Sequence, residues 1–228
     1  MNNSIALGLY YKVIPIIANN VLSSFICLAS QSPRRQELLK QIGVRFELLL
    51  AQEGENTESI ELPLANEKAR AYVERVTLAK SSVALKRWQK SGLSWAPILC
   101  ADTTVSLPNH PDGEILGKPT DAQDAAHILR MLSGKTHEVL TGVAVTPTPN
   151  ESPLFLMQIS EVEFAPLSDE QIQTYIDSGE PFGKAGAYGI QGGASTFIPQ
   201  ISGSYSGIMG LPLYETAQLL KRAQAQTL

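Results

Sequence analysis

The chain has 228 residues, of which 43% are apolar and 18% charged, a composition typical of a folded globular protein. Its net charge of −4 argues against a general nucleic-acid-binding surface, so any cationic site must be local. This length is enough for one large domain or two small lobes.

Residues 1–24 are predicted to form an N-terminal extension ahead of one folded domain over residues 25–228. The extension is apolar, but Lys12 and Pro15 interrupt it, so we expect neither a transmembrane helix nor a signal peptide. Cys27 and Cys100 each lie in an apolar run without a CxxC partner, which indicates buried free thiols in a reducing compartment. We therefore expect a cytoplasmic protein.

The segment over residues 26–46 predicts a buried strand, a tight turn and a helix that begins at Pro33 and ends at Gly43. Arg34 and Arg35 fall in the first turn of this helix, where cations oppose the helix dipole. Free helix amides, a serine-rich turn and two guanidinium groups together indicate an anion site suited to phosphates. The alternative is a solvated arginine pair on a surface helix.

The rest of the chain alternates between strand and helix patterns, which predicts an α/β fold with helices packed on a central sheet. A small-molecule site is then expected at the carboxyl ends of the strands or between lobes. Residues 52–64 are acidic and polar, and are expected to form a loop. Strands are expected over residues 44–51, 96–101, 138–145 and 154–164, and helices over residues 66–90, 121–132 and 168–178.

Asp102 directly follows the predicted strand 96–101, so we expect its carboxylate at a strand end beside Thr103. A carboxylate in that place can hold a divalent metal or orient a water molecule, although aspartate is also a common turn former. Lys118 precedes Pro119, which would hold it extended and direct its ammonium group, but an exposed loop lysine shows the same pattern.

Residues 179–195 contain six glycines in seventeen positions, too many for the interior of a helix or strand. Lys184 adds a cation, Tyr188 a stacking face and Gln191 an amide. Because the apolar residues between them could pack, we favour a loop that contacts a ligand over a flexible loop.

Six motifs follow one another along the chain: SQSPRR (30–35), ADT (101–103), GKP (117–119), LSGKTHEVLTGV (132–143), KAGAYGIQG (184–192) and SGSYSGIMGLP (202–212). Together they resemble the Maf-type nucleoside triphosphate pyrophosphatases, over residues 25–222. KAGAYGIQG in particular resembles the dTTP/UTP branch of that family.

The resemblance implies an elongated α/β architecture, a two-lobed mixed sheet flanked by helices and similar to inosine triphosphate pyrophosphatase, with a nucleotide cleft between the lobes. It implies hydrolysis of dTTP and UTP, or of other pyrimidine nucleoside triphosphates, to the monophosphate and pyrophosphate, as house-cleaning of nucleotide pools. The implied cofactor is a divalent cation, Mg²⁺ or Mn²⁺. The expected partner is the nucleotide, without nucleic acid or membrane, and a homodimer is left open.

A different class of function is also open, in which the protein binds a nucleotide and regulates cell division through a partner, without turnover. A pure binding module has no need of a carboxylate beside a cationic triphosphate site, because the carboxylate costs affinity unless a metal intervenes. Asp102 therefore favours the enzyme.

Matching positions to the family's motifs implies roles for individual residues. Asp102 is implied as the proton acceptor and a metal ligand. Lys80 is matched through YVERVTLAK (72–80), where Val-Thr replaces the usual Leu-Ala. A further acidic position after the second strand is either Glu53 or Glu55. Substrate choice is implied for Arg35, Thr103 and Gln191, and contact with the triphosphate for Ser30, Arg34, Lys80 and Lys118.

Overall fold

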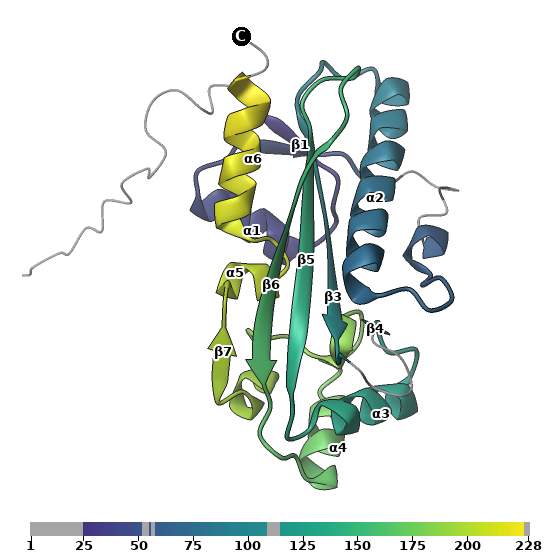
Figure 1. Ribbon diagram of the computed structural model, residues 1–228, viewed down its shortest axis with the longest axis vertical. Helices are drawn as coiled ribbons and strands as arrows, with labels where there is room; N and C mark the ends of the chain where they lie inside the picture. The colour runs from purple at the N-terminus through teal and green to yellow at the C-terminus, as the bar shows by residue number, and fades with distance from the viewer. Residues whose placement is uncertain (1–24, 52–54, 56–57, 109–114, 226–228) are drawn as a thin grey trace, which may run out of the picture.

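The computed structural model describes residues 25–51, 55, 58–108 and 115–225. In this part of the chain, a mixed sheet has seven strands in the order β2-β1-β3-β5-β6-β7, with β4 paired to β3. The molecule is elongated, because three long strands run through most of its length and join an upper and a lower lobe (Figure 1). The predicted α/β class, with helices flanking a mixed sheet, is confirmed. The long strands are β3 (Ile98–Ser106), β5 (Thr136–Thr146) and β6 (Leu154–Glu163).

The upper lobe begins with the predicted strand, turn and helix. Pro33 begins its first helix, and Gly43 closes it in the left-handed region with φ +72°, as predicted. Leu38 and Leu39 on this helix are buried against the parallel strands. The elements of this lobe are β1 (Ile26–Leu28), α1 (Pro33–Gln41), β2 (Phe46–Leu48), the 3-10 turn η1 (Glu58–Glu61), α2 (Ala69–Ser91) and α6 (Leu213–Ala225).

The lower lobe packs short helices and turns around the far ends of the long strands. Its core contains the aromatic rings of Phe164, Tyr175, Tyr188 and Phe197. The helix predicted over 168–178 is present as α4, and a capping box formed by Ser168 and Gln171 begins it. The elements here are β4 (Ile115–Leu116), α3 (Ala122–Leu132), α4 (Asp169–Asp177), the 3-10 turns η2 (Ala185–Ala187) and η3 (Gly193–Phe197), β7 (Gln200–Ser202) and α5 (Tyr205–Ile208).

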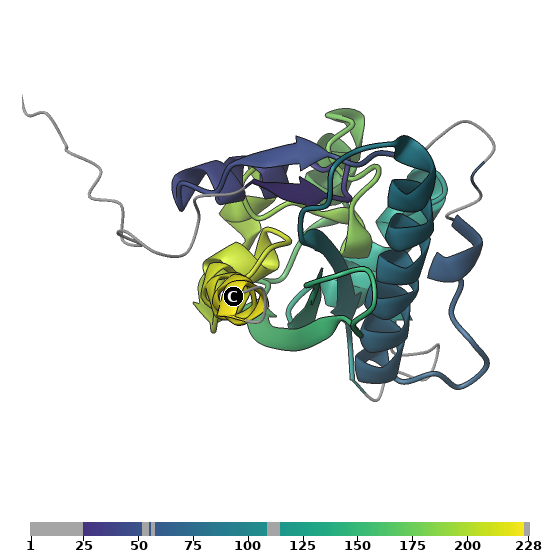
Figure 2. The ribbon, with the colours of Figure 1, turned by 90° about the horizontal axis from the view of Figure 1, so that it is seen from above.

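Helices α2 and α6 cover opposite faces of the long strands (Figure 2). The alternation of side chains along β5 explains this arrangement, because Leu140 packs with α2 whereas Val143 and Val145 pack with α6. Gly142 also faces α2, and a Cβ atom there would lie 2.5 Å from Thr77 Oγ1. The absence of a side chain at this position lets α2 lie close to the sheet.

Strand β3 is longer than predicted, and this difference shapes the site. The sequence prediction ended the strand before Asp102, which is wrong: antiparallel pairing with β5 continues to Ser106, and Asp102 pairs with Gly142. On the other edge of β3, β1 pairs only at its start and β4 only at its end, so a gap in the described sheet lies between them. Asp102 and Thr103 lie on β3 between these two pairings, and both line the cavity described below.

Several boundaries differ from the sequence predictions. The helix predicted from residue 66 begins at Ala69, the strand predicted over 44–51 is limited to Phe46–Leu48, and the predicted acidic loop contains η1. Cys27 and Cys100 are buried and free, as predicted. The predicted extension 1–24 and Glu53 lie outside the described residues. No helix in the described residues combines the length and the apolar character needed to cross a bilayer.

Candidate active site

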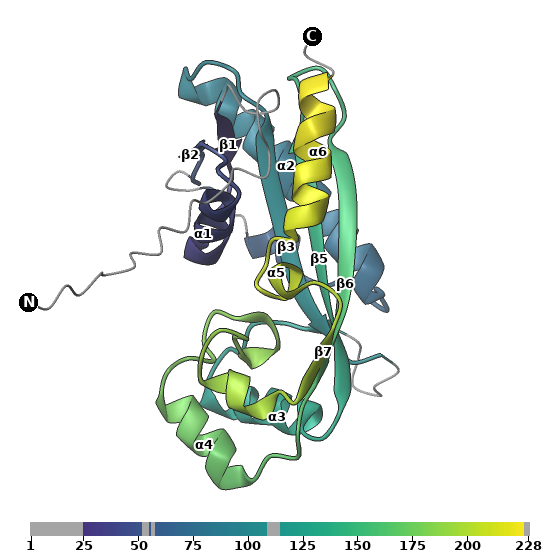
Figure 3. The same cartoon turned by 90° about the vertical axis from the view of Figure 1, so that its left-hand side faces the viewer.

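A cavity of about 610 Å³ lies between the two lobes. The α1 segment lies above it and the glycine-rich turns of the lower lobe lie below it, both on the same side of the long strands (Figure 3). The alternation along β3 places neighbouring residues on different walls of this cavity, so that Asp102 faces α2 and Thr103 faces α1. The cleft predicted between the lobes is therefore present.

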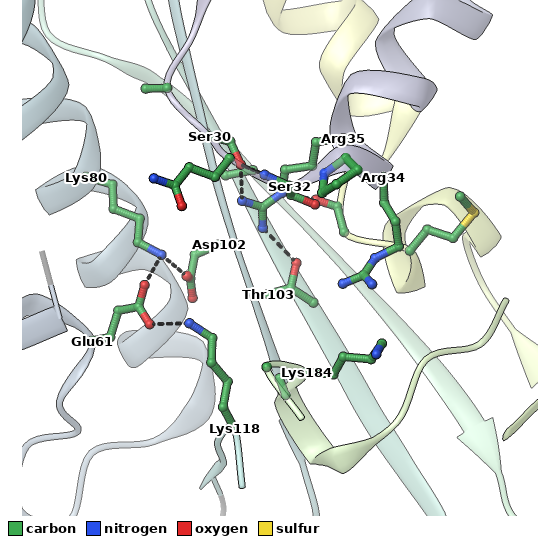
Figure 4. Close-up of a pocket in the computed structure, with 18 of the residues that line it drawn as sticks. Ser30, Ser32, Arg34, Arg35, Glu61, Lys80, Asp102, Thr103, Lys118 and Lys184 are labelled. Atoms are coloured by element: carbon green, nitrogen blue, oxygen red, sulfur yellow. Dashed lines mark hydrogen bonds and ion pairs between the residues drawn. The ribbon is translucent and has the colours of Figure 1, made fainter. Parts of the chain in front are cut away.

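The serine turn before α1 and Arg35 form one connected group at the upper wall (Figure 4). The Ser30 hydroxyl accepts hydrogen bonds from the Ser32 backbone N–H and from Arg35 Nη1, each at 3.2 Å. Arg35 also donates from Nε to the Gly210 carbonyl at 2.7 Å and from Nη2 to Thr103 Oγ1 at 3.3 Å. Burial lowers the pKa of the Arg35 guanidinium. Arg35 thus joins α1, β3 and the segment before α6.

Arg34 differs from its neighbour, because it makes no hydrogen bond or ion pair within the described residues. Its side chain lines the cavity and is available to an anion. Lys184, from the glycine-rich segment, lies on the opposite wall and donates to the Glu180 carbonyl. Burial and the positive charge of Arg34 lower the pKa of Lys184, while Glu180 opposes this shift. A bound polyanion would relieve the repulsion between these two cations.

A chain of alternating charges occupies the α2 side of the cavity (Figure 4). Lys80 Nζ lies 2.5 Å from Asp102 Oδ1 and 2.7 Å from Glu61 Oε1, and Lys118 Nζ lies 2.9 Å from Glu61 Oε2. Burial would raise the pKa of the Glu61 carboxyl, but Lys80 and Lys118 outweigh it and lower this pKa. The structure thus brings the predicted Lys80, Asp102 and Lys118 together through a residue that the sequence analysis did not identify.

The acidic segment after β2 was expected to supply a site residue at Glu53 or Glu55. Glu55 instead forms an ion pair with Arg87 at 2.6 Å, and of the described acidic residues in this segment Glu61 lines the cavity. The sequence signal for a further acidic site residue was the run of acidic residues over 52–64, which follows the cationic SQSPRR motif along the chain. Periodicity could not select one of them, because the segment has no regular pattern.

Gln191 lies apart from the other two residues implied in substrate choice. It is exposed and lines a smaller adjoining cavity of about 240 Å³, whereas Arg35 and Thr103 line the main one. The two cavities adjoin, because both are lined by Arg34, Lys184 and Tyr188.

The loop that carries Gln191 is held by Glu180. The Glu180 carboxylate accepts from the Tyr175 hydroxyl at 2.9 Å and from the Gly193 N–H at 2.8 Å. Tyr188 was predicted as a stacking face, but it is only 6% exposed and its hydroxyl lies 2.8 Å from His137 Nε2. Tyr188 is therefore a wall of the cavities and not an open platform.

The fold and the cleft define an α/β protein in which cationic side chains and a buried carboxylate line one cavity between two lobes. The chain belongs to the Maf family, because residues 25–223 match the family described as Maf-like protein. A relative from Ralstonia nicotianae named dTTP/UTP pyrophosphatase is 58% identical over 196 residues, covering 86% of this chain and 92% of the relative. Relatives with the same name from Burkholderia lata and Albidiferax ferrireducens are 55% and 54% identical, covering 86% and 88% of this chain and 92% and 97% of the respective relatives.

Proposed function

We propose that this protein hydrolyses dTTP and UTP to the nucleoside monophosphate and pyrophosphate, in the cytoplasm, as a house-cleaning enzyme of the nucleotide pool. Membership of the Maf family and the names of the relatives support this activity. The observation that carries it is an incompletely bonded carboxylate, Asp102, beside a cluster of cations in a cleft of the size of a small ligand.

The triphosphate is expected to bind between the N-terminus of α1 and the lysines of the opposite wall. Arg34 and the helix amides meet the phosphates from above, and Lys80 and Lys118 meet them from the α2 side. Ser30 adds a hydroxyl at the same wall. These groups bring positive charge to one place in a chain whose net charge is −4.

The reaction requires a water oxygen to attack the α-phosphorus while the bond to the bridging oxygen breaks and pyrophosphate leaves. Asp102 Oδ2 is buried and has no hydrogen-bond partner among the described residues, so it can accept a proton from this water. The same free oxygen also fits a divalent cation, which binds one or two carboxylates together with substrate phosphates. When bound, Mg²⁺ or Mn²⁺ would neutralise phosphate charge and acidify a water molecule.

The proposal is tested by measuring pyrophosphate release from dTTP, UTP, CTP, the purine triphosphates and 7-methyl-GTP with Mg²⁺ or Mn²⁺. We expect turnover of dTTP and UTP at similar rates, because the two bases differ by one methyl group, which contributes about 1 kcal/mol. Tight binding without turnover of any nucleotide would contradict the enzyme and support the regulator that acts through a partner.

Replacing Arg34 with alanine is expected to weaken binding of dTTP more than binding of dTMP, by a factor of about 10 to 100. The reason is that its guanidinium group is free to form charge-assisted hydrogen bonds with phosphate oxygens. Calorimetric titration of both nucleotides measures the two affinities. Arg34→Lys should restore only part of the loss, since an ammonium group cannot make the bidentate contact. Equal losses for dTTP and dTMP would place Arg34 near the base or sugar.

Replacing Gln191 with glutamate is expected to lower kcat/KM for dTTP and UTP more than for CTP. Uracil and thymine present an acceptor, O4, beside a donor, N3–H, and a glutamine amide can meet both. A carboxylate offers only acceptors, so it repels O4 but can accept from the N4 amino group of cytosine. Steady-state rates with the three nucleotides in both proteins measure the effect.

The orientation of the Gln191 amide decides which base edge it can meet. The Gln191 amide has no hydrogen-bond partner within the described residues, so its orientation is free to follow the base. Gln191→Leu therefore serves as the control, because it removes both polar groups and should lower the three rates together. A parallel decrease for dTTP and CTP in Gln191→Glu would show that this residue does not contact the polar edge of the base.

A further inference from the structure

The ammonium group of Lys80 lies between two carboxylates from different elements. It bonds Asp102 Oδ1 from β3 at 2.5 Å and Glu61 Oε1 from η1 at 2.7 Å (Figure 4). These carboxylates therefore face a common position, which a cation now occupies. An ammonium group is a compact point charge with oxygen partners, which are also the ligands that Mg²⁺ and Mn²⁺ prefer.

The second carboxylate oxygen of Asp102, Oδ2, independently indicates a cation site at this position. The Asp102 side chain is only 9% exposed, yet its Oδ2 has no hydrogen-bond partner in the part of the chain that the structure describes. Leaving a buried carboxylate oxygen without a donor is costly, so this oxygen favours one more electropositive partner. Asp102 lines the main cavity, so that partner can arrive from the cleft.

Glu61 is held in place by the backbone on both sides of it. The Tyr72 hydroxyl of α2 donates to the Glu61 carbonyl at 2.8 Å. Arg75, one turn further along α2, donates to the carbonyls of Ile60 at 3.1 Å and Leu62 at 3.0 Å. Three consecutive carbonyl groups are thus fixed to the helix that also carries Lys80. The position of the Glu61 carboxylate is a built feature of the fold.

We propose that Glu61 and Asp102 form the carboxylate pair that binds the divalent cation, and that Lys80 occupies this pair as a competing cation until the metal enters. On metal binding, Lys80 gives up at least one carboxylate and becomes free to bind a phosphate. Lys118, whose side chain is 56% exposed, can leave Glu61 at low cost and do the same. Replacement of the lysine ammonium groups by the divalent cation would thus bind the metal and free these ammonium groups to contact the triphosphate. The inference rests on the proposed function only for the purpose of the metal.

The test is titration of the nucleotide-free protein with Mn²⁺, followed by calorimetry or by the electron paramagnetic resonance signal of free Mn²⁺. Glu61→Gln is expected to weaken Mn²⁺ binding at least about tenfold, because it removes a charged ligand. Lys80→Met is expected to strengthen Mn²⁺ binding at least about fivefold, because it removes the competing charge. Glu170→Gln is the control, because it removes an exposed carboxylate on α4. This variant should bind Mn²⁺ as the unaltered protein does.

The opposite signs of the two effects separate this proposal from a merely structural role. Unchanged Mn²⁺ affinity in Glu61→Gln, or weaker binding in Lys80→Met, would overturn it. Absence of saturable Mn²⁺ binding in both the unaltered protein and Lys80→Met would also overturn it. The Mn²⁺ titration contains no nucleotide, so it tests the metal site independently of the proposed function. If the Mn²⁺ affinities change as expected but no nucleotide releases pyrophosphate, the metal site is supported and the proposed function is rejected. Pyrophosphate release without these changes in Mn²⁺ affinity would do the reverse.

Discussion

Replacing Asp102 with asparagine is expected to lower kcat for dTTP by a factor of at least about 100, with nucleotide binding retained. The two side chains have nearly the same shape, but the amide is a poor base and a poor metal ligand, and general-base catalysis typically contributes factors of this size. The substitution removes a negative charge and so adds no repulsion toward the anionic triphosphate. Nucleotide binding should therefore persist. Single-turnover rates and calorimetric affinities measure the two effects separately.

A matched control keeps this result interpretable. Asp169→Asn alters an aspartate that also pairs with a cation, Arg130 at 2.8 Å, but on the exposed surface of the lower lobe. Its kcat should equal that of the unaltered protein. The thermal unfolding midpoint of both variants shows whether loss of the Lys80 contact has disturbed the fold. Near-normal turnover of Asp102→Asn at saturating metal would refute the assignment of Asp102.

Replacing Gly186 with alanine is expected to lower the free energy of unfolding by about 2–4 kcal/mol, as a sum of backbone strain and overpacking. Gly186 has φ +68°, and a Cβ atom there would lie 2.6 Å from Val105 Cγ2 on β3. Its N–H also donates to the Gly117 carbonyl at 3.0 Å, next to Lys118. Displacement of this turn should therefore also raise KM for dTTP. Chemical denaturation and steady-state kinetics measure the two consequences.

Gly183 offers a control within the same segment. It has φ +74°, but a Cβ atom added there meets no atom within 4 Å. Gly183→Ala should thus report the backbone strain without the clash, at about 1–2 kcal/mol. Equal destabilisation by the two substitutions would show that the contact between Gly186 and β3 is not close enough to matter.

The strand and helix alternation predicted the α/β class, and local signals predicted the first helix. The anion site at the start of that helix stays a prediction. Pro33 and Gly43 were sufficient for the bounds of that helix, because helix starts and helix ends are local properties. Cys27 and Cys100 were likewise predicted as buried thiols from the apolar runs around them. These are the parts of the molecule in which neighbours in sequence decide the structure.

The remaining parts depend on contacts between distant segments. The polar run after Ala101 resembled a strand end, and only pairing with β5 keeps Asp102 inside a strand. Glu61 reaches the site because Tyr72 and Arg75 hold its backbone, which no periodicity reveals. Gln191 lines the smaller adjoining cavity, in the part of the glycine-rich segment between two 3-10 turns, and its place there depends on how this segment packs.

The bond from Arg35 to the Gly210 carbonyl joins residues 175 positions apart, which has a consequence for biosynthesis. A ribosome completes the arginine pair early and reaches Gly210 only near the end of translation. Contacts that close such large loops form late, because loop closure costs conformational entropy. A nascent or prematurely terminated chain therefore displays the arginine pair without the segment that holds Arg35 in place. Under the proposed function, we expect nucleotide to stabilise only chains that include Gly210, so that ligand-dependent protection from proteases distinguishes full-length chains from fragments.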